Sequence, residues 1–434
     1  MERALLVGVP LKRPGARRVT DDHLRELAEL ADTAGAVVVG TMTQQIERPH
    51  PGTYLGSGKL EELRQQALDE EATLVLFDDE LSPSQGKNIE DAIGVRVMDR
   101  AELILDIFAT RARSAEAKMQ VELAQLEYML PRLTRMWTHL EKFRGGIGMR
   151  GPGETQLETD RRLINQRIKI LRQRLRDVQR GREIQRQSRQ SEFKASLVGY
   201  TNTGKSSILR ALSGASEVFV ENRLFATLDP LTRDVPLGDH AHVLVTDTVG
   251  FIRKLPHHLV ASFRATLEET RDADLLLHVI DASSTTWQEQ RVVVEQVLDE
   301  LGVNEATKVL VFNKIDLLDT DSLLALQERI GALSPSSIFV STVTEGGLEP
   351  LRRVLEASVR SRRTLSHIRM SPSDGKLLAE IHRAGQVQDQ RMDGDLLLVE
   401  ARIDAALAGR IRRAGAKVSV ATAATAQLAV TSHE

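Results

Sequence analysis

The sequence predicts a multidomain α/β protein in which an antiparallel helical hairpin lies between two parallel-sheet domains and a small α/β module follows. Three observations support this fold class. The chain has 434 residues, enough for two to four domains. Short apolar runs alternate with helix-like stretches in two regions, and between them leucine and isoleucine recur with a heptad period. We expect domain boundaries at residues 1–110, 111–194, 195–363 and 364–434.

The N-terminal region has the alternation expected of a parallel sheet. Its short apolar runs, typical of buried strands, are residues 4–9, 36–40, 73–77 and 95–98. Helices are expected over residues 21–33, with Thr20 as the N-cap and Gly35 beyond the end, and over residues 59–70. Because parallel strands need crossover helices, this region predicts a small parallel α/β domain.

The middle region carries two amphipathic helical patterns. Their apolar residues recur at spacings of 4, 3, 4 and 3, first as Met119, Leu123, Leu126, Leu130 and Leu133, then as Ile164, Ile168, Leu171, Leu175 and Val178. Five glycines in residues 145–153 cannot hold a helix and form a flexible turn. The two helices are therefore expected to pack as a hairpin, with Pro131 kinking or ending the first.

Strand and helix alternation returns in the third region and continues in the fourth. Candidate strands of the third region are residues 195–198, 242–246, 275–280, 308–312 and 338–340. The fourth region has expected helices near residues 375–384 and 404–414 and an apolar run at 396–399. A further small α/β module is the simplest interpretation.

The third region opens with a phosphate-binding motif. Residues 199–206, GYTNTGKS, match GxxxxGK[ST] and stand between an expected strand and an expected helix. Glycine lets backbone N–H groups turn inward around a phosphate, and the helix N-terminus adds partial positive charge. Lys205 reaches phosphate oxygens, and the Ser206 hydroxyl can ligate Mg²⁺. The structural alternative is a chance glycine turn with an exposed lysine.

Two further motifs follow strands of the same region. Asp247 and Gly250 form a DxxG motif, in which the carboxylate orients a Mg²⁺-bound water and the glycine amide meets the γ-phosphate. Residues 313–316, NKID, end in a carboxylate that can accept two hydrogen bonds from guanine. Adenine offers neither donor, so Asp316 would stay unpaired with ATP. The three motifs in this order predict a Ras-like P-loop domain that binds guanine nucleotides.

The loop between the first two motifs is expected to be a switch segment. Thr227 is the favoured second hydroxyl on Mg²⁺, and Thr232 is the alternative. Phe251 stands where Ras-type enzymes carry the glutamine that orients the attacking water, so hydrolysis by the protein alone is expected to be slow. Alternatively, Phe251 packs in the core and another switch residue serves that purpose. Ser341 and the Thr342 amide are expected near the guanine O6.

The expected site has catalytic, metal-binding and nucleotide-contacting residues. Catalysis is assigned to Lys205, Thr227 and Gly250, and the Mg²⁺ cofactor to Ser206 and Thr227, with GTP as substrate and GDP as product. The residues expected to contact the nucleotide are Gly199, Tyr200, Thr201, Asn202, Thr203, Gly204, Lys205, Ser206, Ser207, Phe225, Ala226, Thr227, Leu228, Asp229, Asp247, Thr248, Val249, Gly250, Asn313, Lys314, Ile315, Asp316, Ser341, Thr342 and Val343.

Composition and charge bound the function further. With no cysteine, disulfides, thiolate nucleophiles and Cys-containing zinc sites are excluded. No apolar stretch is long enough for a membrane span, and we expect a monomeric cytoplasmic protein, of which a fraction can associate with membranes. The net charge is −3, but residues 161–194 alone carry +9, leaving −12 for the rest. Such a one-signed helix favours RNA contact over a merely solvated face.

Together these motifs resemble the HflX family of translation-associated GTPases. The specific part is residues 145–162, GGIGMRGPGETQLETDRR, and the other similar segments are residues 53–59, 199–206, 225–230 and 247–251. The resemblance implies binding to the large ribosomal subunit and its rRNA, splitting of stalled or stressed ribosomes, and ribosome-stimulated GTP hydrolysis. The alternatives are a GTP-gated RNA or protein scaffold with incidental hydrolysis, and an RNA-dependent ATPase, which Asp316 argues against.

Overall fold

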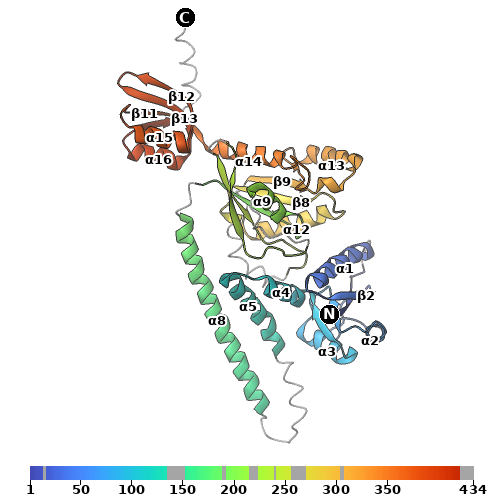
Figure 1. The fold of residues 1–434 in the computed structure, drawn as a ribbon. Helices are drawn as coiled ribbons and strands as arrows, with labels where there is room; N and C mark the ends of the chain where they lie inside the picture. Colours follow the sequence, from blue (N-terminus) through green and yellow to red (C-terminus); the bar gives the residue numbers. More distant parts are fainter. Residues whose placement is uncertain are drawn as a thin grey trace.

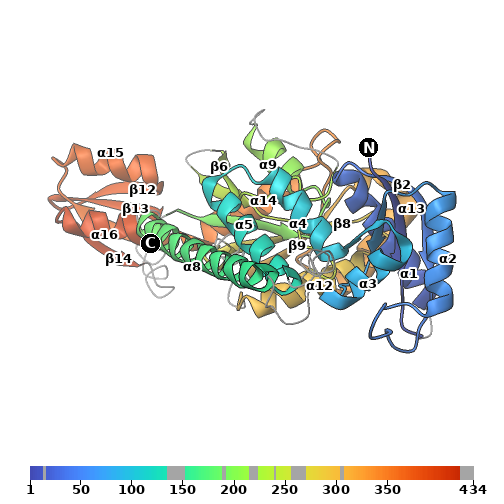
Figure 2. The same cartoon turned by 90° about the horizontal axis from the view of Figure 1, so that it is seen from below.

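The structure, a computed structural model, contains three β-sheets joined by helices (Figure 1). It describes residues 1–12, 16–133, 152–187, 192–214, 223–238, 241–255, 270–303 and 307–420. The glycine-rich turn predicted at residues 145–153 therefore lies mostly outside the described residues. Figure 2 shows the N-terminal and C-terminal sheets at opposite ends of the molecule, with the third region between them.

Four parallel strands form the N-terminal sheet in the order β2-β1-β3-β4. The strands are β1 (Arg3–Gly8), β2 (Val37–Thr43), β3 (Leu74–Phe77) and β4 (Arg96–Asp99), and the helices are α1 (Ala16–Thr33), α2 (Ser57–Asp69), α3 (Pro83–Ile93) and α4 (Arg100–Arg111). The predicted strands are confirmed to within a few residues. The N-cap assigned to Thr20 is wrong, because α1 begins at Ala16 and Thr20 lies inside it.

Helix α3 was not predicted, although its start carries a readable signal. Ser82 and Gln85 form a capping box in which the Gln85 backbone N–H donates to Ser82 Oγ, and the Ser82 N–H donates to Gln85 Oε1. Pro83 occupies the first helical position, where its missing N–H costs nothing. This cap places the following strand, β4, and therefore α4, which lies against the third region.

The middle region forms the predicted helical hairpin. Helix α5 (Ala115–Met129) ends in a 3₁₀ turn, η1 (Leu130–Arg132), at Pro131, and α8 (Pro152–Gln187) runs beside α5 (Figure 1). The seam buries Leu123, Ile168 and Leu171. The heptad prediction is therefore confirmed for the centre of the hairpin, where both apolar stripes meet.

The third region forms a six-stranded sheet in the order β10-β9-β8-β5-β7-β6. Only β6, at one edge, is antiparallel to its neighbour. The strands are β5 (Lys194–Gly199), β6 (Leu231–Pro236), β7 (His242–Asp247), β8 (Leu275–Asp281), β9 (Thr307–Asn313) and β10 (Ile338–Phe339). The helices are α9 (Lys205–Ser213), α12 (Trp287–Glu300), η2 (Ile315–Leu317), α13 (Thr320–Leu333) and α14 (Glu349–Arg362). Parallel strands bring the motif loops to one edge of the sheet.

The fourth region is a βαββαβ unit with an antiparallel sheet in the order β12-β13-β11-β14. Its elements are β11 (Thr364–Met370), α15 (Gly375–Ala384), β12 (Gln386–Asp393), β13 (Leu396–Ile403), α16 (Ala405–Arg413) and β14 (Lys417–Val420). The two predicted helices and the apolar run are confirmed. Strands β12 and β14 were missed because most of their residues are exposed. Strand β11 is more buried, but polar residues interrupt its apolar ones, so it shows no continuous apolar run.

One hydrophobic core joins the first three regions. It continues from α1 and α4 of the N-terminal domain, through α5, to the loop before β6 and the segment after β7. The ring of Phe108 in α4 meets that of Phe225 edge to face, with 4.7 Å between ring centroids. The N-terminal domain therefore packs directly on both loops that the sequence assigns to nucleotide sensing.

Candidate guanine nucleotide site

The phosphate loop connects β5 to α9 and needs glycine at both ends. A Cβ on Gly204, which has a φ of +91°, would lie 2.3 Å from Asn313 Nδ2. A Cβ on Gly199 would lie 2.3 Å from the carbonyl oxygen of Val279. Asn202, between them, also has a positive φ of 60°. The loop can therefore turn its amides inward only with these small residues in place.

Lys205 begins α9 and is buried. Its Nζ donates hydrogen bonds to the carbonyl oxygens of Gly199, at 3.1 Å, and of Tyr200, at 2.7 Å. Burial lowers the pKa of Lys205 to about 8. Because its only hydrogen-bond acceptors among the described residues are neutral carbonyls, the ammonium is poised to meet an anion at the mouth of the loop.

Two hydroxyls and one carboxylate converge next to Lys205. Asp247 Oδ2 accepts hydrogen bonds from Ser206 Oγ at 2.6 Å and Thr227 Oγ1 at 2.7 Å, and the two hydroxyl oxygens are 2.8 Å apart. The other oxygen, Asp247 Oδ1, is buried and accepts no hydrogen bond among the described residues. Burial raises the pKa of Asp247. This set of hard oxygen donors with an unsatisfied carboxylate oxygen fits a divalent cation.

The structure distinguishes between the two candidate threonines. Thr227 lies beside Ser206, whereas Thr232 Oγ1 pairs with Thr246 Oγ1 at 2.9 Å between strands β6 and β7. Thr232 is thus held in the sheet. Only Thr227 is close enough to share a cation with Ser206.

The segment after β7 packs against the phosphate loop. Thr248 Oγ1 donates to the carbonyl oxygen of Leu197 at 2.7 Å, and a Cβ on Gly250 would lie 2.8 Å from Thr201 Cα. Gly250 is therefore required for this close approach. Val249 and Phe251 are buried in the core that continues to the N-terminal domain. The burial of Phe251 favours the interpretation that it is a packing residue and leaves the water-orienting group unassigned.

The loops after β9 and β10 hold the residues assigned to the base. Asn313 Nδ2 donates to the carbonyl oxygen of Thr203 at 2.9 Å, which ties this loop to the phosphate loop. Lys314 Nζ is 2.7 Å from Asp281 Oδ2. Ser341 Oγ donates to Asp316 Oδ1 at 2.6 Å, and the backbone amides of Val343 and Thr344 donate to Ser341 Oγ. Asp316 and Ser341, 25 residues apart in sequence, are thus joined by a hydrogen bond that links the two loops.

The expected residues do not all face the phosphate cavity. Its lining includes Thr201, Asn202, Gly204, Lys205, Ser206, Ser207, Phe225, Ala226, Thr227, Thr248 and Gly250. Asp229 instead accepts hydrogen bonds from the Arg113 and Ser114 amides at 3.1 Å and from the Ser114 hydroxyl, so its carboxylate binds the start of α5. The Leu228 side chain is buried in the shared core. These two side chains make their contacts outside the phosphate cavity, and contact of either residue with nucleotide stays a prediction.

Other residues differ from the expectation in smaller ways. Ile315 is partly buried against the core beneath β9, and Val343 is 81% exposed, so neither side chain faces the phosphate cavity. Thr342 lies in the loop with Ser341 and is partly exposed. Arg223, which lines the phosphate cavity, and Asp281, which pairs with Lys314, were missed. Neither lies in a motif, so the sequence carried no signal for them.

Comparison with known proteins covers nearly the whole chain. Three family descriptions match in succession: GTP-binding GTPase N-terminal at residues 21–109, GTP-binding GTPase Middle Region at 111–189, and 50S ribosome-binding GTPase at 194–314. GTPase HflX of Lacrimispora saccharolytica is 43% identical over 408 residues, which is 94% of each chain. The chain belongs to the HflX family of GTPases. The family resemblance inferred from the motifs is thus confirmed, and the protein is a GTPase that binds guanine nucleotides.

A second HflX relative and a solved structure also match most of the chain. GTPase HflX of Escherichia coli is 43% identical over 379 residues, covering 86% of this chain and 88% of that one. A GTP-binding protein from Sulfolobus solfataricus in complex with GDP is 26% identical, covers 83% of this chain and 99% of that chain, and superposes with a TM-score of 0.45. In the described part of the HflX-family chain, no helix is both long and apolar enough to cross a membrane.

Proposed function

We propose that this GTPase binds the large ribosomal subunit through rRNA and uses GTP to control that association and to split or rescue stalled ribosomes under stress. The family description matched by residues 194–314 names the 50S ribosome. The observation that carries the proposal is the basic surface of α8. In this proposal the protein acts in the cytoplasm as a monomer, and the four predicted domains keep the boundaries given above.

Helix α8 has a basic stripe, Arg162, Lys169, Arg176 and Arg180, opposite its packed seam. Intervals of seven and four residues place these side chains on one face, and all four are exposed. Other basic residues of α8 are partly neutralised, since Arg167 and Arg172 pair with Glu122 and Glu127 of α5. In the stripe, Arg180 is 3.7 Å from Asp177. The stripe is therefore a part of the +9 excess that is available to a phosphate backbone.

GTP and Mg²⁺ would order the phosphate loop together with the loop before β6 and the segment after β7. We infer that Ser206 and Thr227 would hold Mg²⁺, with Asp247 beside them, and that the ion would neutralise phosphate charge. Lys205 would contact the phosphates, and the Gly250 amide would meet the γ-phosphate. The proposed nucleotide contacts are the motif residues that the sequence predicts, without the side chains of Leu228 and Asp229.

Co-sedimentation with separated ribosomal subunits tests the proposal. The wild-type chain should pellet with large subunits in the presence of a GTP analogue, and less so with GDP or without nucleotide. Arg162→Gln/Lys169→Gln/Arg176→Gln should weaken binding and reduce the salt slope by about 0.7 to 0.9 for each phosphate that the variant no longer neutralises. A matched variant, Arg383→Gln/Arg412→Gln/Arg413→Gln, removes the same charge from exposed positions of α15 and α16. Equally weakened binding in both variants would count against the stripe.

Turnover separates this function from the scaffold alternative. A ribosome-controlled GTPase should hydrolyse GTP faster with large subunits than alone, because a partner supplies what Phe251 cannot. A scaffold with incidental hydrolysis should bind subunits with no change in turnover. The measurement is the GTP turnover rate at saturating nucleotide with increasing concentrations of large subunits.

A further inference from the structure

The second residue of the phosphate loop, Tyr200, makes contacts outside the nucleotide site. Its backbone oxygen accepts a hydrogen bond from Lys205, but its buried side chain lies against the N-terminal domain. The hydroxyl donates to Glu26 Oε2 at 2.5 Å and accepts from the Arg253 backbone N–H at 2.8 Å. A phosphate loop needs no hydroxyl here for nucleotide binding, so these contacts call for another explanation.

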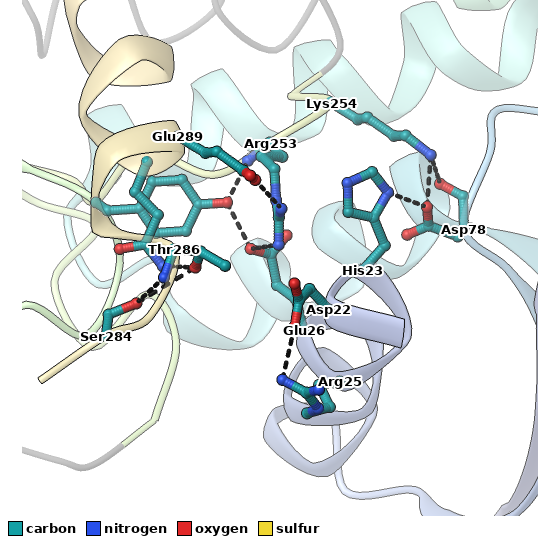
Figure 3. A network of polar contacts seen from close by, with 12 residues as sticks. Asp22, His23, Arg25, Glu26, Asp78, Arg253, Lys254, Ser284, Thr286 and Glu289 are labelled. Atoms are coloured by element: carbon teal, nitrogen blue, oxygen red, sulfur yellow. Dashed lines mark hydrogen bonds and ion pairs between the residues drawn. The ribbon is translucent and has the colours of Figure 1, made fainter. Parts of the chain in front are cut away.

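Glu26, in α1, is the centre of a buried interdomain network. Its carboxylate pairs with Arg100 of α4. The same carboxylate lies 3.4 Å from Arg253 Nη2 (Figure 3). Beside it, Lys254 pairs with Asp78 at 2.5 Å and Asp79 at 2.6 Å. Each carboxylate comes from the N-terminal domain, and Arg253 and Lys254 come from the segment after the DxxG motif. A buried carboxylate that loses a cationic partner is strongly destabilised, so these ion pairs depend on the position of the two domains relative to each other.

Glu26 contacts the two segments that lie next to each other at Gly250, the phosphate loop through Tyr200 and the segment after β7 through Arg253. The Thr201 amide donates to the Phe251 carbonyl oxygen at 2.8 Å, and the Phe251 amide donates to the Gly199 carbonyl oxygen at 3.1 Å. These bonds join the phosphate loop to the segment that leads from Gly250 to Arg253. Because Glu26 holds Tyr200 on one side and Arg253 on the other, a movement of α1 would shift the Gly250 amide relative to the loop.

We propose that Glu26 and Tyr200 are positioning residues for GTP hydrolysis. The N-terminal domain, through Glu26, sets the distance between the phosphate loop and Gly250. Since Phe251 offers no polar group to orient water, the rate depends on this backbone alignment. By linkage, a nucleotide that favours one arrangement of Gly250 also favours docking of α1, and docking favours that nucleotide equally.

Tyr200→Phe is the sharpest test because it removes only the hydroxyl. We expect the turnover rate without ribosomes to fall roughly tenfold, while the dissociation constant for GDP changes less than twofold. Glu26→Gln should reduce turnover at least as much, because Glu26 also pairs with Arg100 and Arg253. The double variant should be no slower than Glu26→Gln alone, because both changes act on the hydrogen bond between Tyr200 and Glu26. Asp79→Asn is the matched control, since it removes an interdomain ion pair without touching the phosphate loop. A Tyr200→Phe variant with wild-type turnover, or an additive double variant, would overturn the proposal.

A second measurement separates positioning from loss of fold. The chain has no cysteine, so Leu68→Cys in α2 and Leu333→Cys in α13, both exposed, allow a fluorescence donor and acceptor to report domain docking. Transfer efficiency should change between GDP and a GTP analogue in the labelled wild-type background and lose that dependence with Tyr200→Phe. If transfer efficiency depends on the nucleotide equally in the wild type and in Tyr200→Phe, the linkage between nucleotide and docking is contradicted. This holds whatever the turnover rate of the variant. Ribosome binding does not enter either experiment, so failure of the proposed function would leave both readable.

Discussion

Two groups of buried charges in this protein differ in how they are paired. At the domain interface, Arg100 has Glu26 and Asp78 as partners, and Lys254 adds a second cation to Asp78. At the phosphate end of the nucleotide site, Lys205 donates only to carbonyl oxygens, and Asp247 Oδ1 accepts no hydrogen bond among the described residues. Each of these interface charges has a partner of opposite sign, although Arg100 Nε and Arg253 Nε and Nη1 find no hydrogen-bond acceptor among the described residues. Lys205 and Asp247 form no ion pair with a described residue, and a bound anion and cation would supply one to each.

The largest effect is expected from removing a charge from the ion pairs of the domain interface. Arg100→Met leaves two buried carboxylates without their shared partner and should lower the free energy of unfolding by about 3–5 kcal/mol. Lys205→Met in nucleotide-free protein should change it by about 1 kcal/mol or less, because relief of desolvation offsets the missing carbonyl hydrogen bonds. Urea unfolding without nucleotide measures both. Equal costs would remove the distinction between the two groups.

The carboxylate of Asp316 should determine which base the nucleotide site prefers. Asp316 has Ser341 as a hydrogen-bond donor and is assigned to two donors of guanine. Asp316→Asn should weaken GTP binding roughly 100-fold, about 2.7 kcal/mol, and favour xanthine nucleotides, whose O2 accepts from an amide. Competition binding with GTP and XTP measures this change. Unchanged preference for GTP would refute the assignment of the base.

The interface should also set the acid sensitivity of the protein. Burial alone would raise the pKa of Asp78, but the hydrogen bond from His23 and the charges of Arg100 and Lys254 outweigh it and lower that pKa. A lowered carboxyl pKa adds stability that is present above the unfolded value, about 3.9, and is lost as pH falls below it. Asp78→Asn should therefore be less stable at pH 7 but lose less stability on acidification. Unfolding at pH 7 and pH 3 compares the two proteins.

Removing an exposed ion pair should have the smallest effect on the free energy of unfolding, and it provides a reference for the buried ion pairs. Arg172 is 60% exposed and pairs with Glu127 at 2.8 Å across the hairpin. Arg172→Gln should change the free energy of unfolding by about 0.5 kcal/mol or less, since water screens the pair. Thermal unfolding in low and high salt measures it. A destabilisation close to that of Arg100→Met would mean that burial does not decide the value of a pair here.

Local signals predicted most of the architecture, and their failures have physical causes. Pro131 marked the end of the first hairpin helix because proline cannot continue its hydrogen bonding. Thr20 failed as a cap because α1 begins four residues before it. The motif residues Ser206, Thr227 and Asp247 meet as expected of a cation site, and their contacts with nucleotide stay predictions. Asp229 and Tyr200 are different, because their side chains bind another domain, which no local pattern encodes.

The sequence alone determined the family, the fold class and the guanine nucleotide motifs, because each depends on residues close together in the chain. A strand, a glycine turn and a helix start are local features, and their chemistry can be read from spacing. Only the tertiary structure decided that Glu26 meets Tyr200, 174 residues away. Such a contact depends on how two domains pack. Ion pairs hold the domains together, because separating them would break the pairs of Glu26 with Arg253 and of Asp78 and Asp79 with Lys254.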